Sequence, residues 1–168
     1  MEARDVLART PLFADVLSAR QLDELAARSK VYDVGKDRVL MTEGDFGTSM
    51  FIIVSGKVDV TVAGTRHPHR EVAMLGPGEL FGEMSLMTGA RRAATVTTME
   101  PTRVVEITKV ALENVLTHSP ELVDHFGAVL AKRRAELEQI ADDEHASRIL
   151  GIRTDEIVGA MRRLFGRG

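Results

Sequence analysis

Short β-type runs separated by glycines between residues 30 and 109 constrain the fold more than any other feature of this sequence. Nine of the fourteen glycines lie in this stretch. Short strands at near-regular spacing, with glycine turns between them, are typical of an antiparallel sandwich or barrel. A mainly β domain is therefore predicted for the middle of the chain. The runs interpreted as strands are 39–41, 50–54, 57–62, 71–75, 94–98 and 103–107.

Helices are predicted on the N-terminal side of this stretch. Residues 1–29 carry apolar residues at helical spacing, interrupted where Thr10 precedes Pro11, because a residue before proline is pushed out of the helical conformation. Two short helices joined by a tight turn at 11–13 are expected, with Ser18 as the N-cap of the second. This segment either packs on the core or moves in response to a ligand, and its pattern suits both.

Further helices are predicted after the β-type stretch. Residues 108–117 carry an apolar helical face, and a longer helix is expected to begin at Pro120 with Ser119 as its N-cap. After a charged break at 141–145, residues 154–165 predict a short amphipathic helix with acids at its start and arginines at its end. Three interpretations of that helix stay open. It docks on its own domain or frays, it contacts a second copy in a homo-oligomer, or it lies on an anionic membrane surface.

The length of 168 residues suits one domain with a small appendage. The net charge of −3 provides no basic field for nucleic acid, which is not expected as a partner. The absence of cysteine excludes disulfides and thiolate chemistry. The segments predicted are 1–29, the N-terminal helical segment; 30–109, the β domain; 110–141, the two C-terminal helices; and 142–168, the charged linker with its short amphipathic helix.

The chain shows no targeting or membrane-spanning pattern. Three of its first five residues are charged and no apolar run follows them, which argues against a signal peptide. The longest strongly apolar run, 50–54, is far too short to span a bilayer. We therefore expect a cytoplasmic location, which includes the cytoplasmic part of an inner-membrane protein.

The segment 81–96, Phe-Gly-Glu-Met-Ser-Leu-Met-Thr-Gly-Ala-Arg-Arg-Ala-Ala-Thr-Val, carries the chemistry of a binding site for a small anion with a sugar attached. Gly82 allows backbone to approach a ligand closely, and Glu83 can accept hydrogen bonds from sugar hydroxyls. The run from Glu83 can form about one and a half helical turns, whose free N–H groups favour a phosphate. Arg92 can bind two phosphate oxygens at once, and the two alanines after it leave backbone N–H groups accessible.

This segment closely resembles the phosphate-binding cassette of cyclic nucleotide-binding domains. The cassette pattern runs Phe-Gly-Glu, a small residue, Leu, several residues, Arg, a small residue, Ala, Thr and Val, and the match is nearly continuous. The turns at 43–47 and 55–57 resemble the same family, with Thr48 where the family often has an acidic residue in a turn. The resemblance covers about residues 10–140. It implies an eight-stranded antiparallel β-roll (jelly roll) with N-terminal helices and a C-terminal lid helix.

The resemblance also implies roles for individual residues. Arg92 would bind the cyclic phosphate, and Glu83 with the Gly82 backbone would hold the ribose 2′-hydroxyl. Backbone N–H groups at Ser85 and near the two alanines would complete the phosphate site, while Arg91 would face solvent. The residues assigned to the site are Gly82, Glu83, Met84, Ser85, Arg92, Ala93 and Ala94 in the cassette, Val72 and Met74 in the base pocket, and Arg133 in the lid helix.

Two of these residues bear on the base of the nucleotide. Arg133 lies inside the apolar stripe of the long helix. It either extends its charged end to water or stacks on an adenine ring as the lid residue, with Arg134 as second choice. Ala93 stands where a threonine in the resembling family often accompanies cGMP, because the hydroxyl can hydrogen-bond guanine. Because alanine has no hydroxyl, cAMP is predicted as the preferred ligand and cGMP as a weaker one.

A sensor without catalytic activity is the function that the resemblance implies, since no activated nucleophile and no acid–base pair are evident. Ligand binding would move the C-terminal helix and so control a neighbouring module. Too few residues follow position 141 for the helix-turn-helix of a catabolite-activator-type regulator, and a kinase regulatory subunit usually has two such domains. The opening 7–13 loosely resembles bacterial cyclic nucleotide-gated channels of the small mechanosensitive-channel type, so a bacterial ion channel is the expected module.

Two alternatives from other classes stay open. One is a β-roll that has lost its ligand and serves as a scaffold for protein interaction, although the intact Gly-Glu and Arg-Ala-Ala-Thr sequences count against it. The other is a metal-dependent enzyme of cupin type. Its ligands would be His67, His69 and Glu71, because alternate residues on a strand can face one way. Pro68 and the flanking arginines favour a solvated loop there instead.

Overall fold

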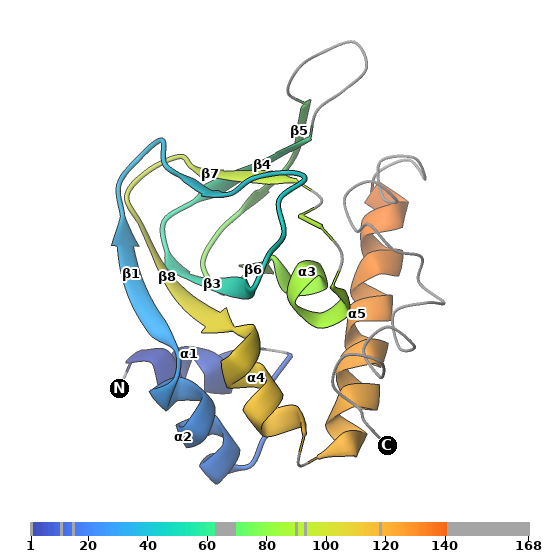
Figure 1. Ribbon diagram of the computed structural model, residues 1–168. Coiled ribbons are helices and arrows are strands. Elements are labelled where there is room, and N and C mark those ends of the chain that lie inside the picture. The colour runs from blue at the N-terminus through green and yellow to red at the C-terminus, as the bar shows by residue number, and fades with distance from the viewer. Residues whose placement is uncertain are drawn as a thin grey trace.

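The computed structural model describes residues 2–140, except for 11, 15, 63–69, 90, 93 and 118. The strands in this part of the chain are β1 Lys30–Val34, β2 Val39–Met41, β3 Ser49–Ser55, β4 Val58–Val62, β5 Arg70–Leu75, β6 Leu80–Phe81, β7 Thr95–Thr98 and β8 Thr102–Thr108. These strands form two antiparallel sheets, which together make a β-roll (Figure 1). The strand orders are β1-β8-β3-β6 and β2-β7-β4-β5. The predicted mainly β fold, an eight-stranded antiparallel roll with flanking helices, is confirmed.

Two of these strands, β1 and β6, have no counterpart among the predicted runs. β1 is mostly exposed and mixes charged residues with valines, so it lacks a clear apolar alternation. β6 is only two residues long. Both strands lie at the edges of the first sheet, next to β8 and β3. Their strand conformation follows from pairing with those neighbours rather than from a local pattern.

Helices cover one end and one side of the roll. α1, α2 and α4 gather at one end, and α5 runs along the side (Figure 1). The predicted cap of α2 is present, because the Ser18 hydroxyl accepts from the Gln21 N–H in a capping box. α5 begins at Pro120, as predicted. The bounds of the helices are α1 Glu2–Arg9, α2 Ala19–Ala27, α3 Glu83–Thr88, α4 Lys109–Leu116 and α5 Pro120–Ile140.

Two apolar clusters hold these layers together, and β3 contributes to both. Met50 and Ile52 belong to the cluster between the first sheet and the helices. Phe51 and Ile53 belong to the cluster inside the roll. Because successive side chains of a strand point to opposite faces, β3 is buried on both sides, which accounts for its continuous apolar sequence.

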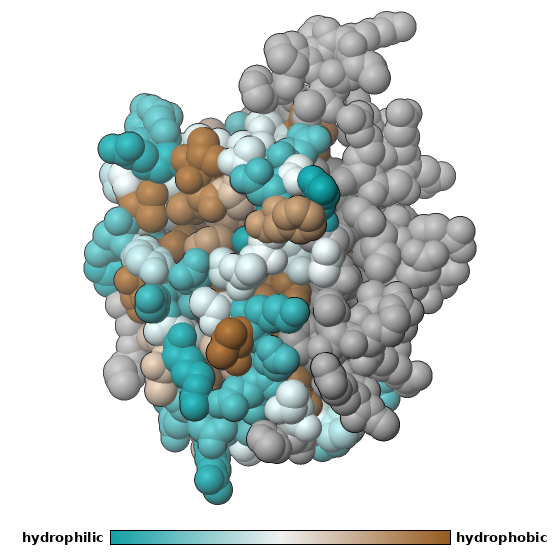
Figure 2. Space-filling view, in the orientation of Figure 1, coloured by the Kyte–Doolittle hydropathy of each residue, from teal (hydrophilic) through white to brown (hydrophobic). Residues whose placement is uncertain are grey.

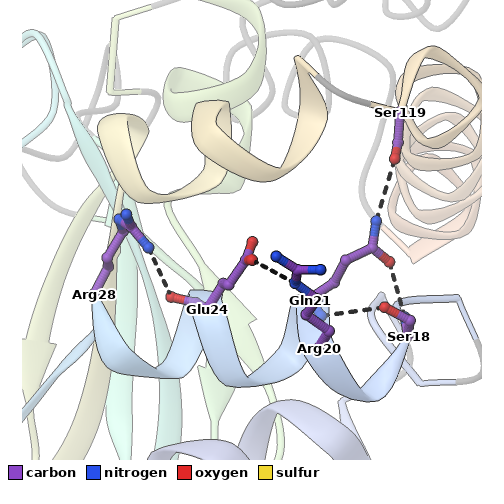
Figure 3. A network of polar contacts seen from close by, with 6 residues as sticks. All are labelled: Ser18, Arg20, Gln21, Glu24, Arg28 and Ser119. Carbon is purple, nitrogen blue, oxygen red and sulfur yellow. Dashed lines mark hydrogen bonds and ion pairs between the residues drawn. The ribbon is translucent and has the colours of Figure 1, made fainter.

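The start of α5 is tied to the N-terminal helices at two places. Phe13, in the turn before α2, and Phe126 of α5 are both fully buried. Their rings meet edge to face with centroids 5.7 Å apart, a favourable geometry for aromatic pairs. Gln21 Nε2 donates to Ser119 Oγ at 3.2 Å and so joins α2 to the residue before α5 (Figure 3).

β1 is attached to β8 by an ion pair as well as by backbone pairing. Asp33 and Arg103 are cross-strand partners. Arg103 Nε donates to Asp33 Oδ1 at 2.7 Å, and Nη2 donates to Oδ2 at 3.0 Å. The hydrogen bond from Arg103 is the main cause that lowers the pKa of the Asp33 carboxyl. Desolvation opposes it, and the charge of Arg103 adds a lesser lowering.

The Asp33 pair makes stability depend on pH. A carboxyl whose pKa is lowered by folding stabilises the fold above its unfolded pKa and loses that contribution as pH falls through the folded pKa. Asp33→Asn is therefore expected to lower Tm slightly at neutral pH, because the pair is exposed, and to leave Tm unchanged in strong acid. Thermal unfolding across the acid range measures both. A loss of Tm that is equal at all pH values would contradict the electrostatic origin.

The surface carries scattered apolar side chains. On the face seen in Figure 2 they lie among hydrophilic residues over the roll. Among the residues that the structure describes, the large apolar ones that are exposed are Val31, Tyr32, Val39, Phe46, Met74, Met99 and Val110. None of the helices in the described part of the chain combines the length and the apolar character needed to cross a membrane.

Candidate functional site

α3 lies between two glycines in the left-handed conformation. Gly82 precedes it with φ of 83°, and Gly89 follows it with φ of 79°, values that other residues rarely adopt. The helix spans Glu83–Thr88, in agreement with the short helical run predicted there. Glu83 is only 5% exposed and Ser85 is also buried. The segment therefore places a carboxylate and a hydroxyl in the interior.

Arg92 is buried beside this helix, whereas Arg91 is not. The exposed fraction of Arg92 is 7%, and its Nη1 donates to the Gly82 carbonyl oxygen at 3.0 Å. Arg91 is exposed. Its guanidinium lies 4.3 Å from the centroid of the Phe46 ring and donates to the Gly44 carbonyl oxygen. The prediction that Arg91 faces solvent is confirmed.

The backbone of Arg92 is held by the turn between β2 and β3. Its N–H donates to the Asp45 carbonyl oxygen at 2.7 Å, and its carbonyl oxygen accepts from the Gly44 N–H at 2.8 Å. The Glu43 N–H donates to Thr95 Oγ1 of β7 at 3.0 Å. The turn and the segment that carries Arg92 are therefore joined at three points.

The site combines a buried cation with carboxylates. Burial lowers the pKa of the Arg92 guanidinium, while the charges of Glu83, Glu106 and Asp45 oppose that shift. The guanidinium stays protonated, because the ordinary pKa of arginine lies far above neutral pH. Glu106 of β8 accepts from the buried Ser49 hydroxyl of β3 at 3.0 Å. Such an arrangement can bind an anion and hydroxyl groups in one place.

The other predicted site residues have different positions. Met84 packs in the cluster between the first sheet and the helices, and Ala94 packs in the cluster inside the roll, so both side chains support the fold. Ala93 lies outside the described residues. Val72 is in β5 and Arg133 is in α5, but their side chains lie outside the described part of the structure.

Met74 does not face the interior of the roll, and its assignment to the base pocket stays a prediction. Its exposed fraction is 52%, whereas Ala73 and Leu75 on either side pack against the interior cluster. Their direct partners in β4, Val60 and Val58, belong to that cluster, and residues opposite one another share a face. Ala73 and Leu75 are therefore the inward residues that sequence reasoning missed, and only the register with β4 identifies them.

The proposed metal ligands cannot be placed. His67 and His69 lie outside the described residues, as does the side chain of Glu71, and the linker and helix predicted for 142–168 lie outside them too. In the regions that the structure describes, no three His, Cys, Asp or Glu side chains are grouped so that they can hold a metal ion.

The cassette residues of this site lie within the part of the chain that matches a known family. The family described as "Cyclic nucleotide-binding domain" matches residues 33–119, just over half of the chain. The "Cyclic AMP receptor protein" of Thermus thermophilus is 32% identical over 107 residues, which cover 64% of this chain and 49% of that protein. A "Cyclic nucleotide-gated potassium channel" of Rhizobium etli is 32% identical over 130 residues, which cover 77% of this chain and 34% of that protein.

A solved structure has the same fold. The N-terminal domain of a transcriptional regulator from Streptomyces coelicolor is 30% identical, with a TM-score of 0.66, and the match covers 80% of this chain and 94% of that domain. This chain spans about half or less of the length of the two curated relatives. The similarity therefore concerns one domain of those proteins.

Proposed function

Because this chain belongs to the cyclic nucleotide-binding domain family, whose domains are regulatory rather than catalytic, we propose that it senses a cyclic purine nucleotide, with cAMP preferred over cGMP. The observation that carries the proposal is the buried Arg92, whose guanidinium lies at the Gly82 carbonyl near the buried Glu83. Burial of a cation is costly, and a bound phosphate would offset that cost through charge-assisted hydrogen bonds.

In this proposal the charges of the cassette bind different parts of the nucleotide. Arg92 binds the cyclic phosphate, and Glu83 accepts from the ribose 2′-hydroxyl. The Gly82 backbone approaches the sugar, because no Cβ stands in the way. Backbone N–H groups at Ser85 and near Ala94 provide further donors to the phosphate. The burial of both charged side chains in one segment supports this division.

The proposed preference for cAMP rests on Ala93, which has no hydroxyl to bind guanine. One hydrogen bond is worth about 0.5–1.5 kcal/mol, which corresponds to a preference of about tenfold at most. For the base we propose contacts from Val72, and stacking by Arg133 as the lid residue. The inward positions of Ala73 and Leu75 add these two residues to the candidates.

α5 is the element through which ligand binding would act on a neighbouring module. A nucleotide that binds better to one position of α5 shifts the population toward that position. The Phe13–Phe126 contact and the Gln21–Ser119 hydrogen bond join the start of α5 to the N-terminal helices. The shift would therefore reach those helices as well.

An ion channel is the first candidate for the regulated module, and a DNA-binding domain is the second. The Rhizobium etli relative supports the channel. The net charge of −3 also provides no basic field for DNA on this domain. The Thermus receptor and the Streptomyces regulator favour the second candidate. Capture of partners from membrane and DNA fractions, with and without cAMP, distinguishes the two.

Calorimetric titration with cAMP, cGMP and 5′-AMP tests the proposed ligand. We expect cAMP to bind with a Kd of about 1 μM or tighter. We expect cGMP to bind up to about tenfold more weakly, and 5′-AMP, which lacks the cyclic phosphate, more weakly again. If the folded protein binds neither cyclic nucleotide, the proposal fails and a scaffold that has lost its ligand becomes the better hypothesis. Stoichiometric metal in the purified protein would favour the cupin-type enzyme instead.

A further inference from the structure

Gly47, in the turn between β2 and β3, faces the side chain of Arg92. A Cβ at position 47 would lie 2.2 Å from Arg92 Cζ, 2.2 Å from Nε and 2.8 Å from Cδ. Such distances are well inside van der Waals contact, which for carbon atoms lies at about 3.5–4.0 Å. The guanidinium of Arg92 therefore occupies the space that any side chain at position 47 would need.

The backbone conformation of the turn does not itself require glycine at position 47. Gly44 and Gly82 have φ values in the left-handed region, whereas Gly47 is not among the residues with positive φ. Another residue can adopt the backbone of Gly47 without strain. The reason for glycine at this position is therefore the space occupied by Arg92.

The guanidinium of Arg92 also occupies the space that a side chain at position 82 would need. A Cβ at position 82 would lie 2.7 Å from Arg92 Nη1, the nitrogen that donates to the Gly82 carbonyl oxygen. The guanidinium thus lies between two residues without side chains, one from the β2–β3 turn and one from the cassette. Only Gly82 belongs to the cassette pattern.

The turn cannot easily move away from Arg92. The two backbone hydrogen bonds that Gly44 and Asp45 make with Arg92 hold it there, and the bond from Glu43 to Thr95 holds its start on β7. A side chain at position 47 would meet the flexible end of Arg92, while the backbone of the turn that carries it is anchored. The guanidinium, rather than the turn, is the part that would be displaced.

We propose that Gly47 is a positioning residue for Arg92, and that its lack of a side chain keeps the guanidinium at the Gly82 carbonyl, where it can receive an anionic ligand. The ligand part of this inference rests on the proposed function, and the position of Arg92 rests on the geometry alone. A side chain at position 47 displaces the end of a flexible side chain, so it impairs binding more than folding.

The test compares Gly47→Ala and Gly47→Val with Gly35→Ala and Gly35→Val in the full chain. Gly35 is the matched control, because it also lies in a turn, lacks positive φ, and has no atom within 4 Å of its Cβ position. The first readout is the Nε–Hε signal of Arg92 in nitrogen-15 NMR spectra without nucleotide, assigned by its loss in Arg92→Leu. We expect this signal to shift in both Gly47 variants and to stay in place in both Gly35 variants.

The second readout is calorimetric titration with cAMP. Gly47→Val is expected to weaken binding by about tenfold or more, since a misplaced guanidinium loses hydrogen bonds to a charged group, and Gly47→Ala is expected to have a smaller effect. In an Arg92→Leu background the valine is expected to cause no further loss. If the valine variant does not fold, the alanine variant provides the same comparison.

The two proposals fail in different ways. An unshifted Arg92 signal together with unchanged affinity in the folded Gly47 variants overturns the positioning role. A further loss of affinity in the Arg92→Leu background also overturns it, because the effect would then not pass through Arg92. If the wild-type chain binds no cyclic nucleotide, the proposed function fails, while a shifted Arg92 signal still supports the positioning role.

Discussion

Replacing Arg92 by leucine is expected to weaken cAMP binding by about 10- to 100-fold. A hydrogen bond to a charged group contributes about 1.5–3 kcal/mol, and each ~1.4 kcal/mol corresponds to tenfold in affinity. Leucine keeps an apolar side chain at a position that is 7% exposed but has no donor for a phosphate. Calorimetric titration with cAMP measures the loss, and thermal unfolding shows whether the roll is still folded.

Arg91 provides the matched control for this prediction. It is the adjacent residue, has the same charge and is exposed, with its guanidinium over Phe46. Arg91→Leu is therefore expected to bind cAMP nearly as the wild type does. Similar losses in the two variants would mean that the summed charge of the pair, rather than the buried guanidinium, attracts the nucleotide, and the assignment of Arg92 to the phosphate would then be wrong.

Phe126→Ala is expected to lower the free energy of unfolding by about 3–5 kcal/mol. The ring is fully buried in the cluster between the first sheet and the helices and meets Phe13 edge to face. Alanine removes this contact and leaves a cavity that the anchored helices can fill only in part. Urea denaturation measures the change. This loss of unfolding free energy is a substantial fraction of the stability of a typical domain. Partial unfolding of α5 is therefore expected in the variant.

Phe46→Ala is the control of the same residue type. Phe46 is 74% exposed and its described ring contact is with Arg91. An exposed cation–π contact is worth about 0.5–1 kcal/mol, so its removal is expected to change stability by no more than that. If Phe126→Ala were as mild as this control, the contact with Phe13 would not anchor α5 to the N-terminal helices.

The geometry of the cassette was predictable because a few adjacent residues encode it. Gly82 and Gly89 adopt the left-handed conformation that ends α3 at both sides. The Ala-Ala-Thr sequence after Arg92 marks it, rather than Arg91, as the inward arginine, and the structure buries it accordingly. The roles of these residues toward a nucleotide stay predictions.

Features that depend on distant parts of the chain could not be predicted in this way. Met74 faces outward because the register between β4 and β5 places its neighbours opposite inward valines. No local pattern in β5 contains that register. In the sequence Gly47 looks like any turn glycine. Only the structure shows that the side chain of Arg92, far along the chain, occupies its Cβ position. β1 and β6 are strands because of their neighbours in the sheet.

The two-sided burial of β3 has a consequence for protein engineering. Met50 and Ile52 help to build the helical layer, while Phe51 and Ile53, between and beside them, help to build the inside of the roll. A designer who grafted the helices of another sensor onto this roll would have to change β3, and each change would lie next to a residue of the opposite face. The two layers are therefore not interchangeable modules. To couple this roll to a new regulated module, fusing that module to an end of the chain is simpler than replacing one layer.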